Sequence, residues 1–352
     1  MTKFILKRIL YGFGVIFGVL IVVFFIFNVL PGDPVEMMVG QRSDVATREA
    51  IQKELGLDKP LSVQLAYYLN DFSPLSVHDD SPYNASKYEY MRVLGIGNKA
   101  LVLKKPYLRR SFQTNKRVDE IIFDHMEGTF YLSISAMLFA TFLGILFGVV
   151  SALKPNSAVD YSLSVLSILG ISVPSFVAAI LMSWVFAVIL AEYTGLEVTG
   201  SLWEMDSLGE GKHLALKNLL LPTITLGLRP LSIIVQLTRG SMLEVLSQDY
   251  IRTAKAKGLR FYKIVLKHAL KNALNPVITA VSGWLASLMA GAFFVEMIFN
   301  WKGLGLVTIN AVMSLDFPVV MGCTVFVAFV FVVINILVDI LYAVIDPRVK
   351  IK

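Results

Sequence analysis

The chain has 352 residues, of which 56% are hydrophobic and 16% charged, and its mean hydropathy is +0.67. This composition is far more apolar than a soluble domain of this length needs, so it excludes an ordinary globular protein and favours a polytopic membrane protein. The net charge of +6 does not indicate nucleic-acid binding, and the single cysteine, Cys323, excludes an intrachain disulfide and a cysteine-based metal site.

Stretches with little or no charge predict the membrane spans. A helix needs about 20 residues to cross roughly 30 Å of hydrocarbon, and each of these stretches is at least that long. The fourth contains one charge, Arg229. The stretches cover residues 9–32, 128–153, 161–191, 218–238, 272–295 and 317–338. We therefore predict an all-α polytopic membrane protein with six transmembrane helices.

The first stretch is longer than the apolar part of a signal peptide, and no small-residue cleavage pattern follows it. We expect residues 1–30 to stay in the mature chain as an N-terminal transmembrane helix. Lys and Arg of the short loops gather near the N-terminus, at Lys154, between Arg239 and Lys271, and in the tail 347–352. By the positive-inside rule these regions are cytoplasmic, so both termini are predicted to lie inside.

Residues 31–127 are predicted to form an extracytoplasmic loop or cap. The loop is nearly neutral, and long loops are largely exempt from the charge rule. Apolar residues at helical spacing predict short amphipathic helices that break at Gly56 and Pro60. These apolar residues are Ile51, Leu55, Leu61, Leu65 and Leu69. Residues 73–106 lack a sustained period and are interpreted as an inserted excursion.

The stretch DYIRTAKAKGLRFYKIVLKHALKNALNP, residues 249–276, lies between the fourth and fifth spans. Ser247 or Asp249 is suited to cap a first helix, and Gly258 is suited to the left-handed position that ends it. Apolar residues then continue at helical spacing until Asn275 and Pro276 permit a break. The pattern predicts a helical hairpin on the cytoplasmic side.

Two interpretations of this basic hairpin differ in what they require. A loop that only sets topology or binds anionic lipid needs Lys and Arg and nothing more. Small residues instead give a short helix a smooth face that is suited to docking in a groove of another protein. The small residues here are Thr253, Ala254, Ala256 and Gly258.

The segment RTAKAKG, followed by HALKNALNP, resembles the EAA loop of ATP-binding cassette importer permeases, in the form of the dipeptide, oligopeptide and nickel subfamily. Arg252 stands where many permeases have Glu, as is usual in the peptide subfamily, and Lys271 stands where a Pro often occurs. The stretches ILKRILYGFGVIFGVLIVVFFIFNVLPGDP, LGLDKPLSVQ, RRSFQTNKRVDEII, TRGSMLEVL and DILYAVIDPRV resemble the same subfamily. The resemblance therefore covers nearly the whole chain except residues 73–106.

This resemblance implies a type I importer permease fold, with a five-helix core at 128–346 and a coupling loop at 239–274. In such importers a helix, here within 249–262, docks in a cleft of a cytoplasmic ATPase. Carried over to this chain, the docking residues are Arg252, Thr253, Ala254, Ala256, Lys257 and Gly258. The implied partners are a second, similar permease, two ATP-binding cassette subunits and an extracytoplasmic solute-binding protein, assembled in the inner membrane.

The implied cargo is a di- or oligopeptide, with nickel complexes and peptide-like antibiotics as alternatives, because the binding protein usually selects it. The chain itself is expected to have no catalytic site and to bind no cofactor, so partner subunits would hydrolyse the ATP. GEGKH at 209–213 lacks the spacing of a phosphate-binding loop, and no HExxH motif or nucleophile with its base is visible.

Polar and kinking residues within the spans are candidates for a translocation pathway or gate. Arg229 costs roughly 2.5 to 3.5 kcal/mol at membrane depth unless it is paired or faces water. It either lines the pathway, snorkels to an interface, or pairs with Asp339 or Glu296. Gly170 and Pro174 mark a kink in the third span, and a kink beside a cavity would serve as a gate. Small residues of the fifth span, Ser287 among them, either pack helices closely or line a passage.

An autonomous transporter driven by an ion gradient is the alternative function. Such transporters usually show inverted repeats and acidic residues well inside the membrane. The sequence shows neither a visible repeat nor an acid near the middle of a span. An energy-coupled import permease is therefore the favoured prediction.

Overall fold

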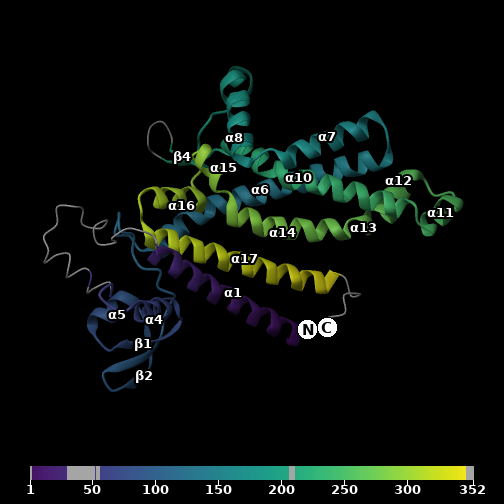
Figure 1. Ribbon diagram of the computed structural model, residues 1–352. Coiled ribbons are helices and arrows are strands. Elements are labelled where there is room, and N and C mark those ends of the chain that lie inside the picture. Colours follow the sequence, from purple (N-terminus) through teal and green to yellow (C-terminus); the bar gives the residue numbers. More distant parts are fainter. Residues whose placement is uncertain (1, 30–51, 53–55, 206–210, 346–352) are drawn as a thin grey trace. The chain divides into compact units, whose positions relative to one another are not determined.

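The computed structural model describes residues 2–29, 52, 56–205 and 211–345 (Figure 1). The predicted tail 347–352 and the predicted helix positions Ile51 and Leu55 lie outside the described residues. The chain divides into two compact units. The first contains the described parts of Met1–His125 and Val307–Val332, and the second contains those of Met126–Leu306 and Val333–Val349.

Within the described ranges, four single helices are long and apolar enough to cross a membrane. They lie in α1 (Thr2–Val29), α6 (Val118–Leu153), α10 (Leu216–Leu246) and α17 (Phe317–Ile345). Two helix pairs, Ala158–Ser172 with Ser175–Ile189 and Phe261–Ala273 with Asn275–Ala290, pass the same test only together and are bent by 111° and 53°. The predicted six spans are reached only if each bent pair counts as one span.

The predicted fourth span lies within α10, which stays one helix of 31 residues although Pro222 and Pro230 are inside it. The predicted third span is instead interrupted. Helix α7 (Ala158–Ser172) ends at Val173, and α8 (Ser175–Trp184) begins after Pro174. Both intervening residues have extended backbones, which is what a proline requires of the residue before it.

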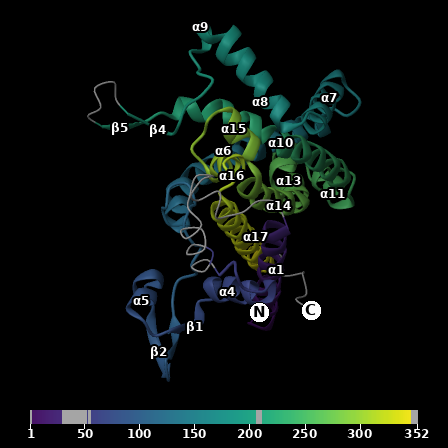
Figure 2. The same cartoon turned by 60° about the vertical axis from the view of Figure 1, so that its left-hand side comes forward.

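The first unit contains a small sheet that the sequence did not predict (Figure 2). Strands β1 and β2 pair antiparallel with the central strand β3, and α4 precedes them. The elements are α4 (Leu61–Phe72), β1 (Leu75–Asp79), α5 (Pro82–Tyr88), β2 (Met91–Ile96) and β3 (Lys99–Leu103). The expectation of a purely helical chain is wrong here, because the segment interpreted as an inserted excursion, 73–106, forms strands.

The core of the small sheet is partly polar. In β1 the buried residues are Ser76 and His78, which hydrogen bond to each other at 3.0 Å, whereas β3 buries Ala100 and Val102. Lys104 is also buried, and this burial lowers its pKa to about 8. Polar and apolar residues do alternate along β1, but the polar ones are buried and Leu75 and Val77 are exposed, which inverts the pattern expected of a half-buried strand.

Helix α1 packs on α4 and on the beginning of α17. Phe24 of α1 lies 5.7 Å from Tyr68 of α4 between ring centroids, and Phe27 lies 5.5 Å from Phe317 of α17. The loop before α6 is fixed by the buried carboxylate of Asp316, which accepts a hydrogen bond of 3.0 Å from the backbone N–H of Phe112. These contacts hold the N-terminal helix and the loop segment 56–117 in one unit.

The second unit contains the bundle around α10. Besides α7 and α8 it includes two π-helical segments, η1 and η2, and a two-stranded antiparallel hairpin, a second departure from an all-α chain. Its elements are η1 (Val185–Ile189), α9 (Ala191–Thr194), β4 (Trp203–Met205), β5 (Lys212–Leu214), α11 (Asp249–Ala256), α12 (Phe261–Lys263), η2 (Ile264–Ala269), α13 (Leu270–Ala273), α14 (Asn275–Gly291), α15 (Phe293–Ile298) and the first residues of α16 (Leu304–Met313).

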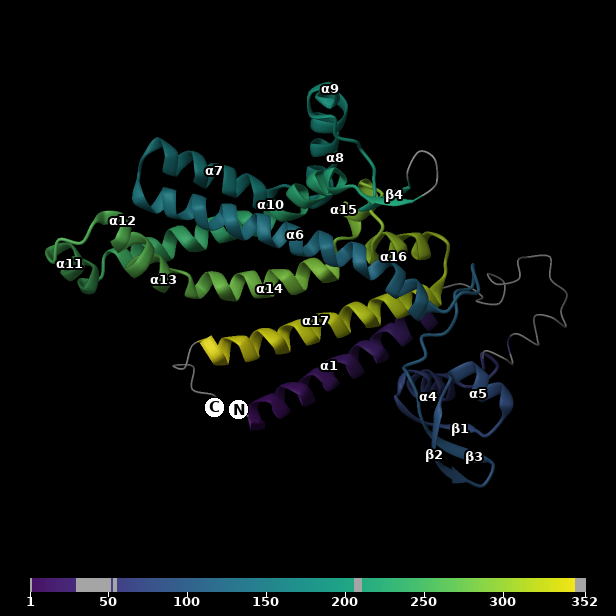
Figure 3. The same cartoon turned by 180° about the vertical axis from the view of Figure 1, so that it is seen from behind.

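Small residues let α6 and α10 approach closely. A Cβ atom on Gly148 of α6 would lie 2.5 Å from Cβ of Thr238 and 2.8 Å from the carbonyl oxygen of Val235. Gly144, one turn earlier, is as close to Ile234. Helix α7 runs beside α6 and α10 (Figures 1 and 3), and α8 leaves α7 at 111° while still contacting α10. The bundle thus has a tightly packed stem formed by α6, α7 and α10.

Candidate functional site

Helix α11 is the predicted coupling helix, and it begins without a side-chain cap. Its N-cap is Gln248, so the expected capping by Ser247 or Asp249 is wrong. The Ser247 hydroxyl instead donates to the carbonyl oxygen of Glu244 at 2.7 Å. Asp249 lies in the first turn, where a negative charge favours the helix dipole, and its carboxylate is 3.4 Å from the guanidinium of Arg252.

The end of α11 confirms the predicted role of Gly258 in the turn. Gly258 has φ +70°, its N–H donates to the carbonyl oxygen of Lys255 at 2.9 Å, and the N–H of Leu259 donates to that of Ala254 at 3.4 Å. This pair of bonds is the Schellman arrangement. A Cβ atom at Gly258 would meet nothing within 4 Å, so glycine is needed for its backbone conformation, worth about 1 kcal/mol, and not for space.

The two faces of α11 differ in what they contact. Ile251 is 0% exposed and Ala254 is 7% exposed, and both belong to a buried cluster formed with the ends of α6 and α10 and with η2 and α13. The other members of this cluster are Ala152, Met242, Ile264, Val265, Ala269 and Ala273. The interpretation of Ala254 as a docking residue is therefore corrected, because its side chain faces its own chain.

The remaining predicted docking residues are exposed. They are Arg252, Thr253, Ala256, Lys257 and Gly258, which we call the outer face of α11. The Thr253 hydroxyl is occupied locally, since it donates to the carbonyl oxygen of Asp249 at 3.0 Å. The outer face thus combines two small residues and one short polar residue with two long basic side chains.

The second limb of the hairpin returns through α12, η2 and α13. The break predicted at Asn275 and Pro276 is present, because α14 begins at Asn275 after a bend of 53°. Asn272 joins the two limbs by donating through Nδ2 to the hydroxyl of Tyr250 at 2.9 Å. Ile251 and Ala254, which we call the inner face of α11, pack the hairpin against the bundle stem, and the Asn272–Tyr250 bond holds its two limbs together.

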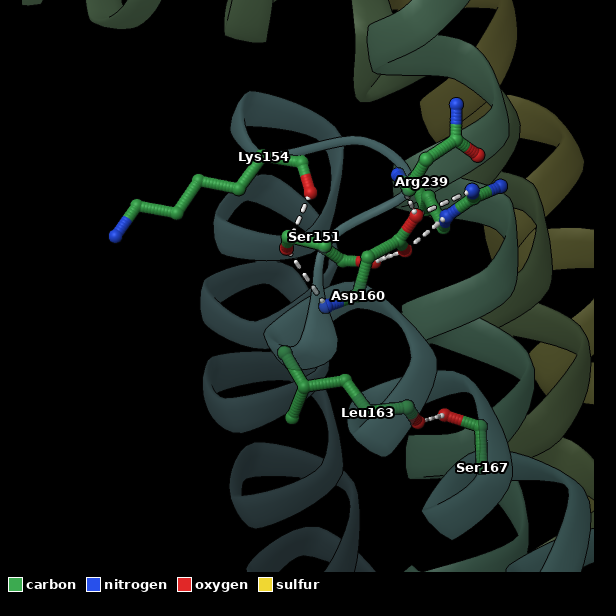
Figure 4. Close-up of polar contacts among 8 residues, drawn as sticks. Ser151, Lys154, Asp160, Leu163, Ser167 and Arg239 are labelled. Carbon is green, nitrogen blue, oxygen red and sulfur yellow. Dashed lines mark hydrogen bonds and ion pairs between the residues drawn. The ribbon is translucent and has the colours of Figure 1, made fainter.

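An ion pair between a buried carboxylate and a partly exposed guanidinium lies next to the hairpin (Figure 4). Arg239 of α10 donates from Nε to Oδ1 of Asp160 at 2.6 Å and from Nη2 to Oδ2 at 2.8 Å. Asp160 is 2% exposed, and it also accepts hydrogen bonds from the Ser151 hydroxyl and from the backbone N–H of Asn156. The carboxylate is therefore fully bonded, as a buried charge requires.

From sequence, Asp160 and Arg239 only bound uncharged stretches, and Arg239 also begins the basic loop, so neither was predicted to pair. One local signal was available: Ser157 stands three residues before Asp160, as in a capping box. Ser157 is indeed the N-cap of α7, and its hydroxyl accepts from the N–H of Asp160 at 3.3 Å. The pairing with Arg239, 79 positions away, could not be read from this signal.

The four pathway candidates lie on different elements. Arg229 is exposed on α10, and among the described residues no ion pair involves it. Gly170 of α7 is a packing position, because a Cβ atom there would lie 2.2 Å from the hydroxyl oxygen of Ser232. Pro174 is the N-cap of α8 at the 111° bend, and Ser287 is exposed on α14.

Glu296 of α15 is another buried carboxylate and does not pair with Arg229. It is 0% exposed and accepts from the Thr129 hydroxyl of α6 at 2.7 Å and from the N–H of Leu306 at 3.0 Å. The same Thr129 oxygen accepts from the N–H of Leu304 at 2.8 Å. Glu296 thus fastens the first turn of α16 to α6.

The stability of the protein is expected to depend on pH through Glu296. Burial raises its pKa from the ordinary 4.5 to about 7, opposed by its hydrogen bonds to Thr129, Leu306 and Gly305. Because the folded-state pKa is the higher one, this contribution is fully present below pH 4.5 and is lost as the pH rises to about 7, by about 3 kcal/mol. Thermal unfolding in detergent between pH 4.5 and 8 measures it. Glu296→Gln should lose this part of the profile, and an unchanged profile would contradict the assignment.

Among the residues that the structure describes, no group of three or more His, Cys, Asp or Glu side chains is placed to hold a metal ion.

Comparison with known proteins identifies the family. Residues 144–351 match the family described as "Binding-protein-dependent transport system inner membrane component", and residues 1–133 match the N-terminal part of such components. The dipeptide transport system permease protein DppB of Alkalihalophilus pseudofirmus is 35% identical over 99% of this chain and 100% of its own. Its namesake from Escherichia coli is 34% identical over the whole of both chains, and that from Bacillus subtilis is 34% identical over 99% and 98%. The chain therefore belongs to the family of binding-protein-dependent transport system inner membrane components.

Proposed function

We propose that this chain is a permease subunit of an ATP-driven importer whose cargo is a di- or oligopeptide. The family is a transport component of the inner membrane and not an enzyme. The cargo class is supported by relatives that are named dipeptide transport permeases and match the chain over its full length. ATP would be hydrolysed by two ATP-binding cassette subunits, and a second permease and a solute-binding protein would complete the transporter.

The observation that carries the coupling role is the division of α11 into two faces. The inner face is buried against α6, α10, η2 and α13, so a displacement of α11 must move these elements or break the cluster. The outer face is exposed, small and basic, which suits insertion into a groove with acidic edges on an ATPase. We propose Arg252, Thr253, Ala256, Lys257 and Gly258 as the docking residues, in a hairpin on the cytoplasmic side.

The same proposal assigns the remaining parts of the chain. Both termini would be cytoplasmic, and residues 31–127 would lie outside the cell membrane together with the small sheet. Arg229 and Ser287, which are exposed on α10 and α14, are proposed to line the pathway. Pro174 is proposed as a hinge, because it lies between two helices that meet at 111°.

Replacing Ala256 by a large side chain tests the docking role. Ala256→Trp places a bulky ring on the outer face without entering the buried cluster, so it should abolish the stimulation of ATP hydrolysis by loaded binding protein. Ala256→Ser keeps the small size at the same position and should retain stimulation close to that of the wild type. The measurement is the ATPase rate of the purified transporter in proteoliposomes, with and without binding protein and peptide.

Assembly must be measured in parallel by copurification of the four kinds of subunit. Normal stimulation in an assembled Ala256→Trp transporter would refute docking through this face. Peptide uptake that continues without any ATPase subunit, driven by an ion gradient, would refute the importer itself and favour the autonomous transporter.

A further inference from the structure

We infer that Asp160 and Arg239 are positioning residues for coupling: their ion pair joins α7 to α10, so that movement of α11 reaches the break between α7 and α8. This inference rests on the proposed function, since it concerns how the motion of a docked α11 is passed on. Neither residue touches the exposed outer face of α11, and neither was among the residues assigned to docking or to the pathway.

The first step leads from α11 to α10. Met242 lies three positions after Arg239, about one turn of α10, and is 0% exposed. It belongs to the same buried cluster as Ile251 and Ala254 of α11. Only Ser247 and Gln248 separate α10 from α11. The last turns of α10, including Arg239, are therefore packed together with the coupling helix.

The second step leads from α10 to α7, which is held at both of its ends. Near its beginning, Asp160 receives both hydrogen bonds of the Arg239 fork (Figure 4). Near its end, Gly170 lies so close to α10 that a Cβ atom would be 2.2 Å from the Ser232 hydroxyl and 3.3 Å from the carbonyl oxygen of Leu228. A helix fixed at two points along its neighbour cannot rotate or slide independently of it. Helices α7 and α10 therefore act as one rigid body.

The third step leads from α7 to α8. The rigid pair ends at Val173 and Pro174, where the chain is extended and turns by 111°. The N–H of Val173 still bonds back to Leu169, and that of Ala178 bonds back to Pro174, so each helix is complete on its own side of the joint. A change of backbone angle at these two residues would reorient α8 without unfolding either helix.

The chemistry of the pair favours a geometric role over simple stabilisation. This ion pair contributes little net stability, because the buried Asp160 carboxylate loses its water and the Arg239 guanidinium stays partly exposed to solvent. A bidentate Arg–carboxylate contact, however, fixes distance and direction together. Here the orientation is enforced further by Ser151 of α6 and by the N–H of Asn156, which occupy the remaining positions on the carboxylate.

Neutralising both partners separates positioning from stability. Arg239→Gln alone leaves the buried Asp160 carboxylate without its cationic partner and is expected to reduce assembly, more than Asp160→Asn, which leaves the partly exposed Arg239. The double variant Asp160→Asn/Arg239→Gln removes both charges and should assemble like the wild type. We expect it to keep ATPase stimulation by loaded binding protein, whereas labelled peptide taken up per ATP hydrolysed should fall roughly tenfold. The complete transporter in proteoliposomes provides both rates.

Further variants keep the test decisive. Ser151→Ala removes a bond from α6 but leaves the α7–α10 contact, so its uptake per ATP should match the wild type. If the double variant does not assemble, Arg239→Lys retains the charge and loses the fork, and a reduced uptake per ATP is then expected. Wild-type uptake per ATP in an assembled double variant, or in Arg239→Lys if that variant is needed, would overturn the inference. Failure of the proposed docking role would be seen separately, because the Ala256→Trp transporter would then show normal stimulation of ATP hydrolysis by loaded binding protein.

Discussion

Gly148→Ala is expected to destabilise the bundle strongly, whereas Gly18→Ala should leave its stability nearly unchanged. The added methyl group at position 148 would meet Cβ of Thr238 at 2.5 Å and the carbonyl oxygen of Val235 at 2.8 Å. Neither atom belongs to the end of a flexible side chain, so α6 must move away from α10. Overpacking of this kind costs about 1–3 kcal/mol. Gly144 and Gly148 form a G-x-x-x-G pair, the spacing at which membrane helices pack most closely.

The control is matched in both substitution and sequence context. Gly14 and Gly18 of α1 have the same spacing in an apolar helix, yet a Cβ atom at either position would meet nothing within 4 Å. Thermal unfolding of the two purified variants in the same detergent compares them directly. Equal unfolding midpoints for Gly148→Ala and Gly18→Ala would show that the α6–α10 contact is looser than these distances require.

Glu296→Ala is the second substitution for which we expect a large loss of stability. The Thr129 hydroxyl and the N–H of Leu306 would lose their acceptor in a site that is 0% exposed. Each buried donor left without a partner costs about 1–3 kcal/mol. Truncation also leaves a cavity beside Gly303, where a Cβ atom would now lie 2.3 Å from the carboxylate. The first turn of α16 would lose its main attachment to α6.

Glu296→Gln provides the comparison for this prediction. It keeps the length of the side chain and one acceptor oxygen, but its NH₂ group cannot accept a hydrogen bond, whereas the second oxygen of the acid that is protonated at pH 5 still can. The expected order of unfolding midpoints near pH 5 is therefore wild type, then Glu296→Gln, then Glu296→Ala. Limited proteolysis around residues 300–306 should follow the same order. An alanine variant as stable as the glutamine variant would mean that the hydrogen bonds contribute little.

The membrane helices could be predicted because hydrocarbon imposes a simple rule of length and charge. The break in the third span could be predicted at Pro174, but the kink expected at Gly170 was wrong, because that residue lies inside α7 and packs on α10. The sheet at 75–103 was missed because Ser76, His78 and Lys104 are polar residues on its inner side. A polar core of this kind inverts the alternation by which half-buried strands are normally recognised, because the apolar residues of β1 point outward.

In the candidate site, too, local features could be predicted from the sequence and contacts between separate elements could not. The left-handed conformation of Gly258 was predictable, because it is a property of one residue and its immediate neighbours. The burial of Ala254 was not, because it depends on how α11 packs against its neighbours α10 and η2 and against the end of α6, which is about 100 residues away in sequence. The ion pair of Asp160 with Arg239 was missed for the same reason. Local chemistry indicated the cap of α7 and gave no information about its partner on α10.

The division of labour on α11 has a consequence for protein engineering. Ile251 and Ala254 pack against other elements of their own chain. Arg252, Ala256 and Lys257 are exposed and do not belong to the buried cluster. The exposed residues of the outer face can therefore be substituted together without changing the fold of the hairpin, provided that Gly258 is retained for the turn. A permease with changed outer-face residues, together with an ATPase whose groove carries compensating changes, would form a second transporter. The two transporters could then work in one cell without exchanging ATPase subunits.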